Sequence, residues 1–175
     1  MQPRVPWGLP DDALPDNGGM REVKAPARPG LERRVFLAGS IEMGTAEQWQ
    51  ERVVRALSEA GDVVVLNPRR DDWDAGWEQS IGNAKFREQV EWELEAQERA
   101  SLIGMYFAPA TRAPVTLLEL GLFARSGKLV VCCAEGFWRK GNVDVVCARY
   151  GVPLVAELAE FVRFLRGRLS GRTSR

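Results

Sequence analysis

The fold is decided by Leu102–Phe107 (LIGMYF), the turn Ala108–Val115 (APATRAPV) and the following segment Thr116–Gly121 (TLLELG). A short apolar run bounded by turn residues is typical of a buried strand, and the segment after the turn predicts a helix. A strand, a turn and a helix in this order indicate a parallel α/β sheet. Glu119 would then lie in the first turn of a helix that follows a strand.

Two interpretations of Glu119 follow from this position. The helix macrodipole and the unpaired N–H groups of a first turn favour an ionised carboxylate. Such a carboxylate, held above the end of a strand, can attack an electron-poor carbon such as the anomeric carbon of a nucleoside. Thr116 and Glu119 also fit a capping box, in which the glutamate bonds back to the start of its own helix. The pattern alone leaves both interpretations open.

Strands and helices are predicted to alternate on both sides of this unit. We expect a single-domain α/β protein with a flavodoxin-like (Rossmann-like) five-stranded parallel sheet, helices on both faces and strand order 2-1-3-4-5. Ligands bind such sheets beyond the carboxyl ends of the strands, where loops begin at Gly39, Asn67, Ala108 and Ala134. The predicted strands are Val35–Ala38, Asp62–Leu66, Leu102–Phe107, Leu129–Cys133 and Pro153–Val155, and the predicted helices are Thr45–Ala60, Ala84–Ala100, Thr116–Ser126, Asn142–Tyr150 and Glu157–Arg168.

Composition divides the chain into three parts. Residues 1–32 hold six of the ten prolines and little periodicity, so we predict a flexible N-terminal arm. Residues 33–167 form the predicted domain, and residues 168–175 form a basic polar tail.

Charge and residue usage exclude several classes of function. Lysine plus arginine equals aspartate plus glutamate, 24 each, which argues against a nucleic-acid or membrane-surface binder. The chain has no histidine, so Ser-His-Asp and Cys-His mechanisms and histidine-based metal sites are excluded. We expect neither cofactor nor metal. The three cysteines fit no disulfide framework, and without a signal-peptide pattern we predict reduced thiols in a cytoplasmic protein.

Glu93 is the second candidate for chemistry. At 100° per residue it lies within the apolar stripe of its predicted helix, close to Phe86 and Val90. A carboxylate there is costly unless it is paired or faces a cavity. It could pair with Arg69 or Arg70, or it could serve a site. Three further glutamates of this helix share the presumed solvent face: Glu91, Glu95 and Glu98.

The long loop Asn67–Asn83 contains further candidates. Trp73 offers a flat face on which a base can stack, and Arg69 and Arg70 offer planar donors for phosphate or carboxylate. Loops of this length in compact domains are usually functional or disordered. The alternative is a lid that is packed by its own aromatic residues.

Two other turns carry weaker signals. The turn at Gly39 and Ser40 contains glycine but is neither GxGxxG nor a P-loop, and its N–H groups could meet a ribose or phosphate. Asn142 could cap the helix that follows it, or it could present its amide to a sugar hydroxyl.

These motifs together resemble the nucleoside 2-deoxyribosyltransferases, and more closely their 2-deoxyribosyltransferase-like branch. The resemblance spans about residues 34–155. It is carried by Val35–Ser40 (VFLAGS), Asn67–Asp74 (NPRRDDWD), Gln89–Leu94 (QVEWEL), Thr116–Gly121 (TLLELG) and Gly136–Asp144 (GFWRKGNVD).

The resemblance implies specific roles. Glu119 would be the nucleophile, Glu93 would handle the nucleobase, and Asn142, given by a neighbouring subunit, would touch the sugar or the nucleophile. We therefore expect a homodimer or higher homo-oligomer. The residues predicted to bind substrate are Gly39, Ser40, Arg69, Arg70, Trp73, Asp74 and Asn142.

This sequence departs from the transferases at two positions. Their aspartate in the turn before the nucleophile helix is absent from Ala110–Pro114, and a tyrosine of their first strand is replaced by Phe36. Both changes leave room for an N-glycoside other than a 2′-deoxyribonucleoside, including a phosphorylated one read by Arg69, Arg70, Arg112 or Ser40.

The predicted function is cleavage of the N-glycosidic bond of a nucleoside or nucleotide through a covalent glycosyl-glutamate. The sugar would pass to another base or to water. The alternatives are an NAD or nucleotide N-glycohydrolase and a non-catalytic nucleotide-binding sensor. The expected ligands are small nucleosides, nucleotides and nucleobases.

Overall fold

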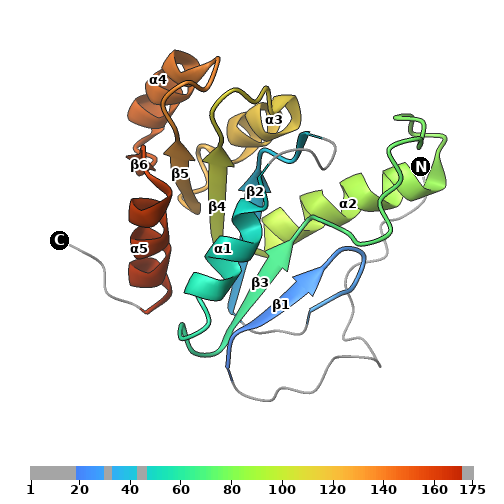
Figure 1. The fold of residues 1–175 in the computed structure, drawn as a ribbon, viewed down its shortest axis with the longest axis horizontal. Helices are drawn as coiled ribbons and strands as arrows, with labels where there is room; N and C mark the ends of the chain where they lie inside the picture. Colours follow the sequence, from blue (N-terminus) through green and yellow to red (C-terminus); the bar gives the residue numbers. More distant parts are fainter. Residues whose placement is uncertain (1–18, 30–32, 43–46, 171–175) are drawn as a thin grey trace.

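A computed structural model describes residues 19–29, 33–42 and 47–170. Its centre is a parallel sheet with strand order β1-β3-β2-β4-β5-β6 (Figure 1). The strands are β1 (Arg21–Lys24), β2 (Arg33–Gly39), β3 (Val63–Asn67), β4 (Leu102–Phe107), β5 (Leu129–Cys133) and β6 (Leu154–Val155). β2 and β4 pair in parallel at the centre, with Phe36 opposite Ile103.

Helices cover both faces of this sheet, because each face carries its own apolar cluster. α1 (Trp49–Ala56) and α5 (Leu158–Leu169) pack on one face, with Trp49 and Phe161 fully buried there. α2 (Ala84–Arg99), α3 (Pro114–Phe123) and α4 (Lys140–Tyr150) pack on the other, where Trp92 and Leu120 contribute to the core. The predicted α/β fold with a flavodoxin-like strand order is therefore confirmed for β2 to β6.

One strand was not predicted from the sequence. Arg21–Lys24 had been assigned to a flexible arm, but they form β1 at the edge of the sheet, paired in parallel with β3. Trp92 Nε1 of α2 donates a hydrogen bond to Ala27 O at 2.8 Å, which ties the chain after β1 to the domain. The sheet thus has six strands where five were predicted. Residues 1–18 and 30–32 lie outside the described part.

Helix boundaries differ from the prediction at functionally relevant points. α3 begins at Pro114, two residues before the expected Thr116, and its N-cap is Ala113. α4 begins at Lys140, so Asn142 lies inside the helix. The interpretation of Asn142 as the N-cap of this helix is therefore wrong. α1 begins at Trp49, while the first residues of the predicted helix, 45 and 46, lie outside the described part.

A glycine is required where β2 ends beside β4. Gly39 has φ +155°, and a Cβ atom there would lie 2.5 Å from Tyr106 O. This close approach allows Ser40 N to bond to Tyr106 O at 3.0 Å, which extends the pairing beyond the strand. The turn at Gly39 and Ser40 is therefore shaped by backbone packing between neighbouring strands.

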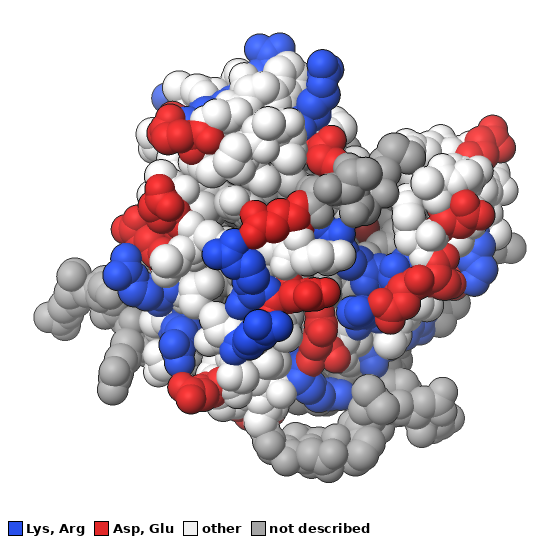
Figure 2. All heavy atoms as spheres, viewed as in Figure 1, with Lys and Arg blue, Asp and Glu red and all other residues white. Residues whose placement is uncertain are grey.

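The surface carries both signs of charge, and the three cysteines are buried. On the face shown in Figure 2, acidic and basic side chains are interspersed, as zero net charge suggests. Cys132, Cys133 and Cys147 are buried free thiols, and burial raises the pKa of each to about 11 or 12. In the described part of the chain, no helix is both long and apolar enough to cross a membrane.

Candidate active site

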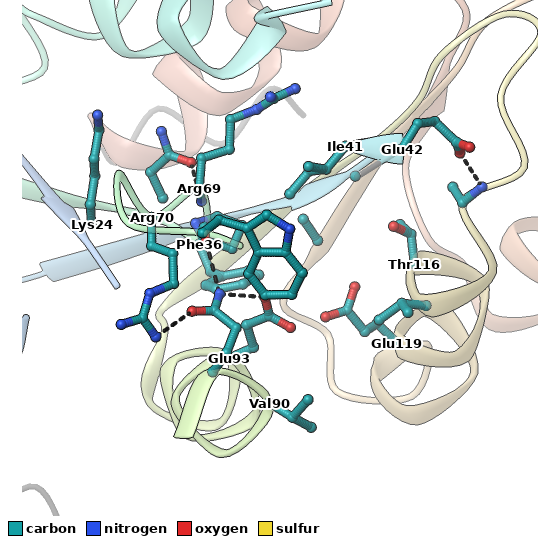
Figure 3. A pocket seen from close by; sticks show the side chains of 18 of the residues that line it. Lys24, Phe36, Ile41, Glu42, Arg69, Arg70, Val90, Glu93, Thr116 and Glu119 are labelled. Carbon is teal, nitrogen blue, oxygen red and sulfur yellow. Dashed lines mark hydrogen bonds between the residues drawn. The ribbon is translucent and has the colours of Figure 1, made fainter. Parts of the chain in front are cut away.

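A pocket of about 810 Å³ lies at the carboxyl ends of β2, β3 and β4. The loops after these strands form its walls, and α2 and α3 supply the side chains that face it (Figure 3). This is the edge of the sheet at which α/β proteins bind ligands. Of the nine residues predicted to be catalytic or substrate-binding, six line the pocket: Gly39, Arg69, Arg70, Trp73, Glu93 and Glu119.

Glu119 lies in the second turn of α3 and is only 6% exposed. Its Oε1 accepts a hydrogen bond of 2.6 Å from Gln97 Nε2 of α2. The capping-box interpretation is wrong, because Thr116 is inside the helix and the start of α3 has no side-chain cap. Glu119 therefore faces the pocket and α2, away from the start of its own helix.

Glu93 approaches Glu119 from the neighbouring helix. Figure 3 shows the two carboxyl groups pointing toward one another, one from α2 and one from α3. Glu93 Oε1 accepts a hydrogen bond of 2.8 Å from Gln89 Nε2, one helical turn earlier. Of the two alternatives left open by the sequence, an ion pair of Glu93 with Arg69 or Arg70 is not among the described contacts, and Glu93 lines the pocket.

Burial controls the protonation of this carboxyl pair. It raises the pKa of Glu93 to about 7, against the hydrogen bond from Gln89. Burial, and then repulsion from Glu93, raise the pKa of Glu119 to about 8, against the hydrogen bond from Gln97. The expectation that the macrodipole keeps Glu119 ionised is therefore wrong, since the residue lies beyond the first turn and desolvation dominates. With these pKa values the pair carries between one and two protons at pH 7 and loses the first of them just above neutral pH.

Arg70 lies on the same wall but is compensated by acidic groups. Its side chain is buried and forms a two-point contact with Asp72, with Nε–Oδ1 at 2.6 Å and Nη2–Oδ2 at 3.0 Å. Glu88 lies 3.2 Å from Nη1, and the guanidinium stacks on the ring of Trp77. Arg70 Nη1 also reaches Gln89 Oε1 at 3.5 Å, so Gln89 stands between Arg70 and Glu93.

The loop of residues 67–83, named the tryptophan loop for Trp73 and Trp77, is compatible with both interpretations, a lid packed by its own aromatic residues and a wall of the binding site. Trp73 and Trp77 pack edge to face with ring centroids 5.1 Å apart, as expected for a loop held by its own aromatics. Trp73 also lines the pocket together with Phe36, Phe86 and Val90. These side chains give the pocket an apolar wall close to the two carboxyl groups.

Three further cations line the pocket. Arg69 Nε donates to Gln50 Oε1 at 2.9 Å, and burial lowers the pKa of this arginine. Lys24, at the end of β1, pairs with Asp71 at 2.7 Å. Arg112 precedes α3 and stacks on the ring of Trp138.

Three predicted substrate-binding residues do not line the pocket. Ser40 is fully buried, and its Oγ bonds to Thr111 Oγ1 at 2.7 Å and accepts from Ala108 N. Asp74 is exposed and accepts from Gly76 N within its own turn. Asn142 is exposed on α4, away from the pocket of its own chain.

Glu42 is a pocket residue that the sequence analysis did not identify. Its Oε1 accepts hydrogen bonds from Arg112 N at 2.9 Å and Ala113 N at 2.8 Å. A carboxylate thus reaches the turn before the Glu119 helix from the neighbouring loop, although that turn contains no aspartate. Glu42, Ala110 and Ala113 all have positive φ, a conformation rarely adopted by residues other than glycine.

The glutamines that hold the two carboxyl groups were also missed. Gln89, Glu93 and Gln97 follow one another at i, i+4 and i+8, so they share one face of α2. This spacing was a usable sequence signal. Among the described residues, no group of three or more Cys, Asp or Glu side chains could hold a metal ion.

The comparison with protein families gives this site its context. The family described as nucleoside 2-deoxyribosyltransferase like matches residues 32–137, which include both carboxyl groups of the site. The chain belongs to the nucleoside 2-deoxyribosyltransferase-like family. A comparison with curated proteins found no match. Membership supports nucleoside glycosyl transfer in general terms, and a pocket with an apolar wall and two carboxyl groups fits a small nucleoside.

Two parts of the molecule lie outside the matched region. β1 with Lys24 precedes it, and Asn142 follows it. The family match therefore covers the carboxyl pair and the tryptophan loop, while the pocket contact from β1 is a feature of this chain beyond the match.

Proposed function

We propose that the protein cleaves the N-glycosidic bond of a nucleoside or nucleotide by double displacement, with Glu119 as nucleophile and Glu93 as general acid. The observation that carries this proposal is the pair of buried carboxyl groups that face each other in the pocket. Two carboxyl groups, one ionised and one protonated, can supply a nucleophile and an acid near neutral pH.

In the first step a Glu119 oxygen forms a bond to C1′ while the bond from C1′ to the base nitrogen breaks. The departing base keeps the electron pair and takes the proton from Glu93. Positive charge develops at C1′, next to Glu119. This charge stabilises the ionised form of Glu119, so that the proton of the pair resides on Glu93, where the acid is needed.

In the second step the glycosyl ester is opened. A nitrogen of another base, or water, forms the new bond to C1′, and Glu119 leaves as a carboxylate. Glu93 takes a proton from the incoming nucleophile and is ready for another cycle. The apolar wall formed by Phe36, Trp73, Phe86 and Val90 favours a stacked base over water.

A screen for released base tests this function. Nucleosides, nucleotides and NAD would be incubated with the protein, with and without an acceptor base, and the products separated by chromatography. Glu119→Gln should abolish release, whereas Glu91→Gln, an exposed change on α2, should leave it intact. Mass spectrometry of acid-quenched protein should detect a glycosyl adduct on the peptide that contains Glu119. Full turnover by Glu119→Gln would overturn the mechanism.

Hydrolysis of a nucleotide or NAD is a second candidate, favoured by the cations at the pocket. Lys24, Arg69, Arg70 and Arg112 line it, and its volume of about 810 Å³ leaves room beyond a nucleoside. This candidate predicts that a 5′-phosphate lowers KM and that Arg69→Ala or Arg112→Ala removes the preference. Equal KM values for nucleoside and nucleotide would exclude it. Tight calorimetric binding of an intact nucleotide, without base release over hours, would instead favour a sensor.

The proposal includes a homo-oligomer in which Asn142 serves the pocket of a neighbouring subunit. Val115, Leu118 and Leu122 form an apolar stripe on α3 and are 58%, 65% and 57% exposed. Val145 of α4 is 69% exposed. Apolar side chains in such a row favour contact with a second copy of the chain.

Subunit complementation tests this arrangement. Asn142→Ala and Glu119→Gln should each be inactive alone, whereas a mixture of the two should regain activity, because one pocket in each mixed dimer has both residues intact. Light scattering of the wild type and Leu118→Lys gives the subunit number. A monomeric wild type with full activity would contradict the oligomeric site.

A further inference from the structure

Gln97 lies behind the carboxyl pair, outside the pocket lining. Its side chain is fully buried beneath the two carboxyl groups, on α2 one helical turn after Glu93. Its Nε2 donates to Glu119 Oε1 at 2.6 Å and to the backbone oxygen of Glu93 at 3.3 Å. One side-chain amide thus contacts both residues that carry the chemistry.

The backbone oxygen of Glu93 fixes the orientation of this amide. A carbonyl oxygen only accepts hydrogen bonds, so the NH₂ group of Gln97 must face it. The reversed orientation would bring Gln97 Oε1 against that carbonyl and against Glu119. The two contacts together therefore present an N–H donor to Glu119 in a fixed direction.

We propose that Gln97 is a positioning residue, whose amide holds one oxygen of Glu119 and so directs the nucleophile toward the pocket. The inference rests on the proposed function for the role of Glu119. Because the donor stabilises a carboxylate, it acts twice in the double displacement: before the attack on C1′, and when Glu119 leaves from the glycosyl ester.

The surroundings of Glu119 make this donor important. The titratable side chain that faces it from a neighbouring element is Glu93, which disfavours its ionised form, as burial also does. Gln97 is the group that opposes both effects. Gln89 has the equivalent role for Glu93, to which it donates at 2.8 Å.

Gln97→Met tests the inference, because methionine keeps the length of the side chain and removes the donor. The change also removes Gln97 Oε1, a buried acceptor with no hydrogen-bond partner among the described residues. The variant should therefore fold with a Tm close to that of the wild type. Gln97→Leu provides a second apolar variant of similar volume.

The first measurement needs no substrate. Carboxyl-carbon NMR of protein labelled at glutamate, assigned by comparison with Glu119→Gln and Glu93→Gln, follows the titration of both groups. In Gln97→Met the pKa of Glu119 should rise by about 1, which lowers the ionised fraction at pH 7 about tenfold. Glu91→Gln, the exposed control, should leave this titration unchanged. An unaltered Glu119 titration in Gln97→Met would overturn the proposal.

The second measurement uses the substrate found in the screen. The acid limb of the kcat/KM profile should move to higher pH in Gln97→Met, and kcat should fall about tenfold at pH 7 with a smaller change in KM. A purely structural role would lower activity equally at all pH values, and that result would overturn the inference. A wild type that releases no base would overturn the proposed function, while the NMR titration would still decide the role of Gln97.

Discussion

Two clusters of ionisable side chains line the same pocket, and their charge is handled in opposite ways. Arg70 is buried, but Asp72 and Glu88 compensate its charge and Trp77 covers its guanidinium. Glu93 and Glu119 are held by glutamine amides, with no cation among their described contacts. A buried charge with its counter-ions is stable in one state, whereas a buried acid without them keeps its proton near neutral pH. The Arg70 cluster therefore has a structural role in the pocket wall, whereas the Glu93–Glu119 pair can exchange a proton with a substrate.

Gln89 separates the two clusters. Its Oε1 lies 3.5 Å from Arg70 Nη1, while its Nε2 donates to Glu93 and to Pro68 O. A direct contact between Arg70 and Glu93 would lower the pKa of Glu93 and remove the acid. The neutral amide of Gln89 therefore links Arg70 to Glu93 by hydrogen bonds and keeps the positive charge of Arg70 out of direct contact with the carboxyl group of Glu93.

The largest expected effect is on kcat, and it distinguishes the role of Glu93 from that of Glu119. Glu93→Gln should lower kcat about 100-fold with an ordinary nucleoside, because the base departs without a proton. A substrate whose leaving group needs no proton should restore most of this loss. The same substrate should give no rescue in Glu119→Gln, which lacks the nucleophile. Steady-state kinetics with the two substrates check this, and rescue of both variants would contradict the assignment of roles.

The next effect concerns stability and its dependence on pH. The raised pKa of Glu119 means that the folded protein keeps a proton that the unfolded chain loses above pH 4.5. Stability therefore falls as pH rises from about 4.5 toward 8, and Glu119→Gln removes this loss. From the shift of Glu119 from 4.5 to about 8, the variant should be more stable than the wild type by about 4 kcal/mol at pH 8 and nearly equal to it at pH 4.5.

Urea unfolding at the two pH values measures this difference. Glu91→Gln serves as control, since it makes the same chemical change at an exposed position of α2. If the wild type is more stable than Glu119→Gln at pH 8, other groups must stabilise the ionised carboxylate of Glu119. Glu119 would then resemble Arg70, whose buried charge is compensated, and the proposed difference between the two clusters would be wrong.

Arg70→Met should lower the stability of the protein and leave the pH dependence of catalysis unchanged. The change removes the contacts with Asp72, Glu88 and Trp77, so the free energy of unfolding should fall by about 1–2 kcal/mol. The pH of half-maximal kcat/KM should stay within a few tenths of the wild-type value. Thermal unfolding and the pH profile check both parts, and a displaced profile would mean that Arg70 acts directly on Glu93.

The smallest effect is expected at the residue between the clusters. Gln89→Met removes one donor from Glu93, whose pKa should rise by less than 1, and kcat at pH 7 should change no more than a few-fold. Glu93 stays protonated in this variant and can still act as acid. A loss as large as that of Glu93→Gln would place Gln89 itself in contact with the reacting atoms.

Several features could be predicted because they depend on local sequence. The apolar run Leu102–Phe107 and the run Leu129–Cys133 were assigned with the bounds the structure has. Glu93 was found because helical periodicity places it among apolar side chains. The order of five strands followed from right-handed crossovers, which apply to almost any sequence of alternating strands and helices.

Other features could not be predicted because they depend on contacts between distant segments. β1 has four residues and is stabilised by pairing with β3, so composition alone placed it in an arm. The contact between Glu42 and the turn before α3, about 70 residues later, is of the same kind, since Arg112 N and Ala113 N donate to its carboxylate across that separation.

The sequence by itself determined an α/β fold, a carboxylate after the third predicted strand and another on the preceding helix, because periodicity and turn residues act over a few positions. Only the tertiary structure decided that Glu93 and Glu119 face each other, that burial raises the pKa of both, and that Gln89 and Gln97 hold them. The reason is that protonation depends on burial and on neighbours from other elements, and neither exists until α2 and α3 pack on the sheet.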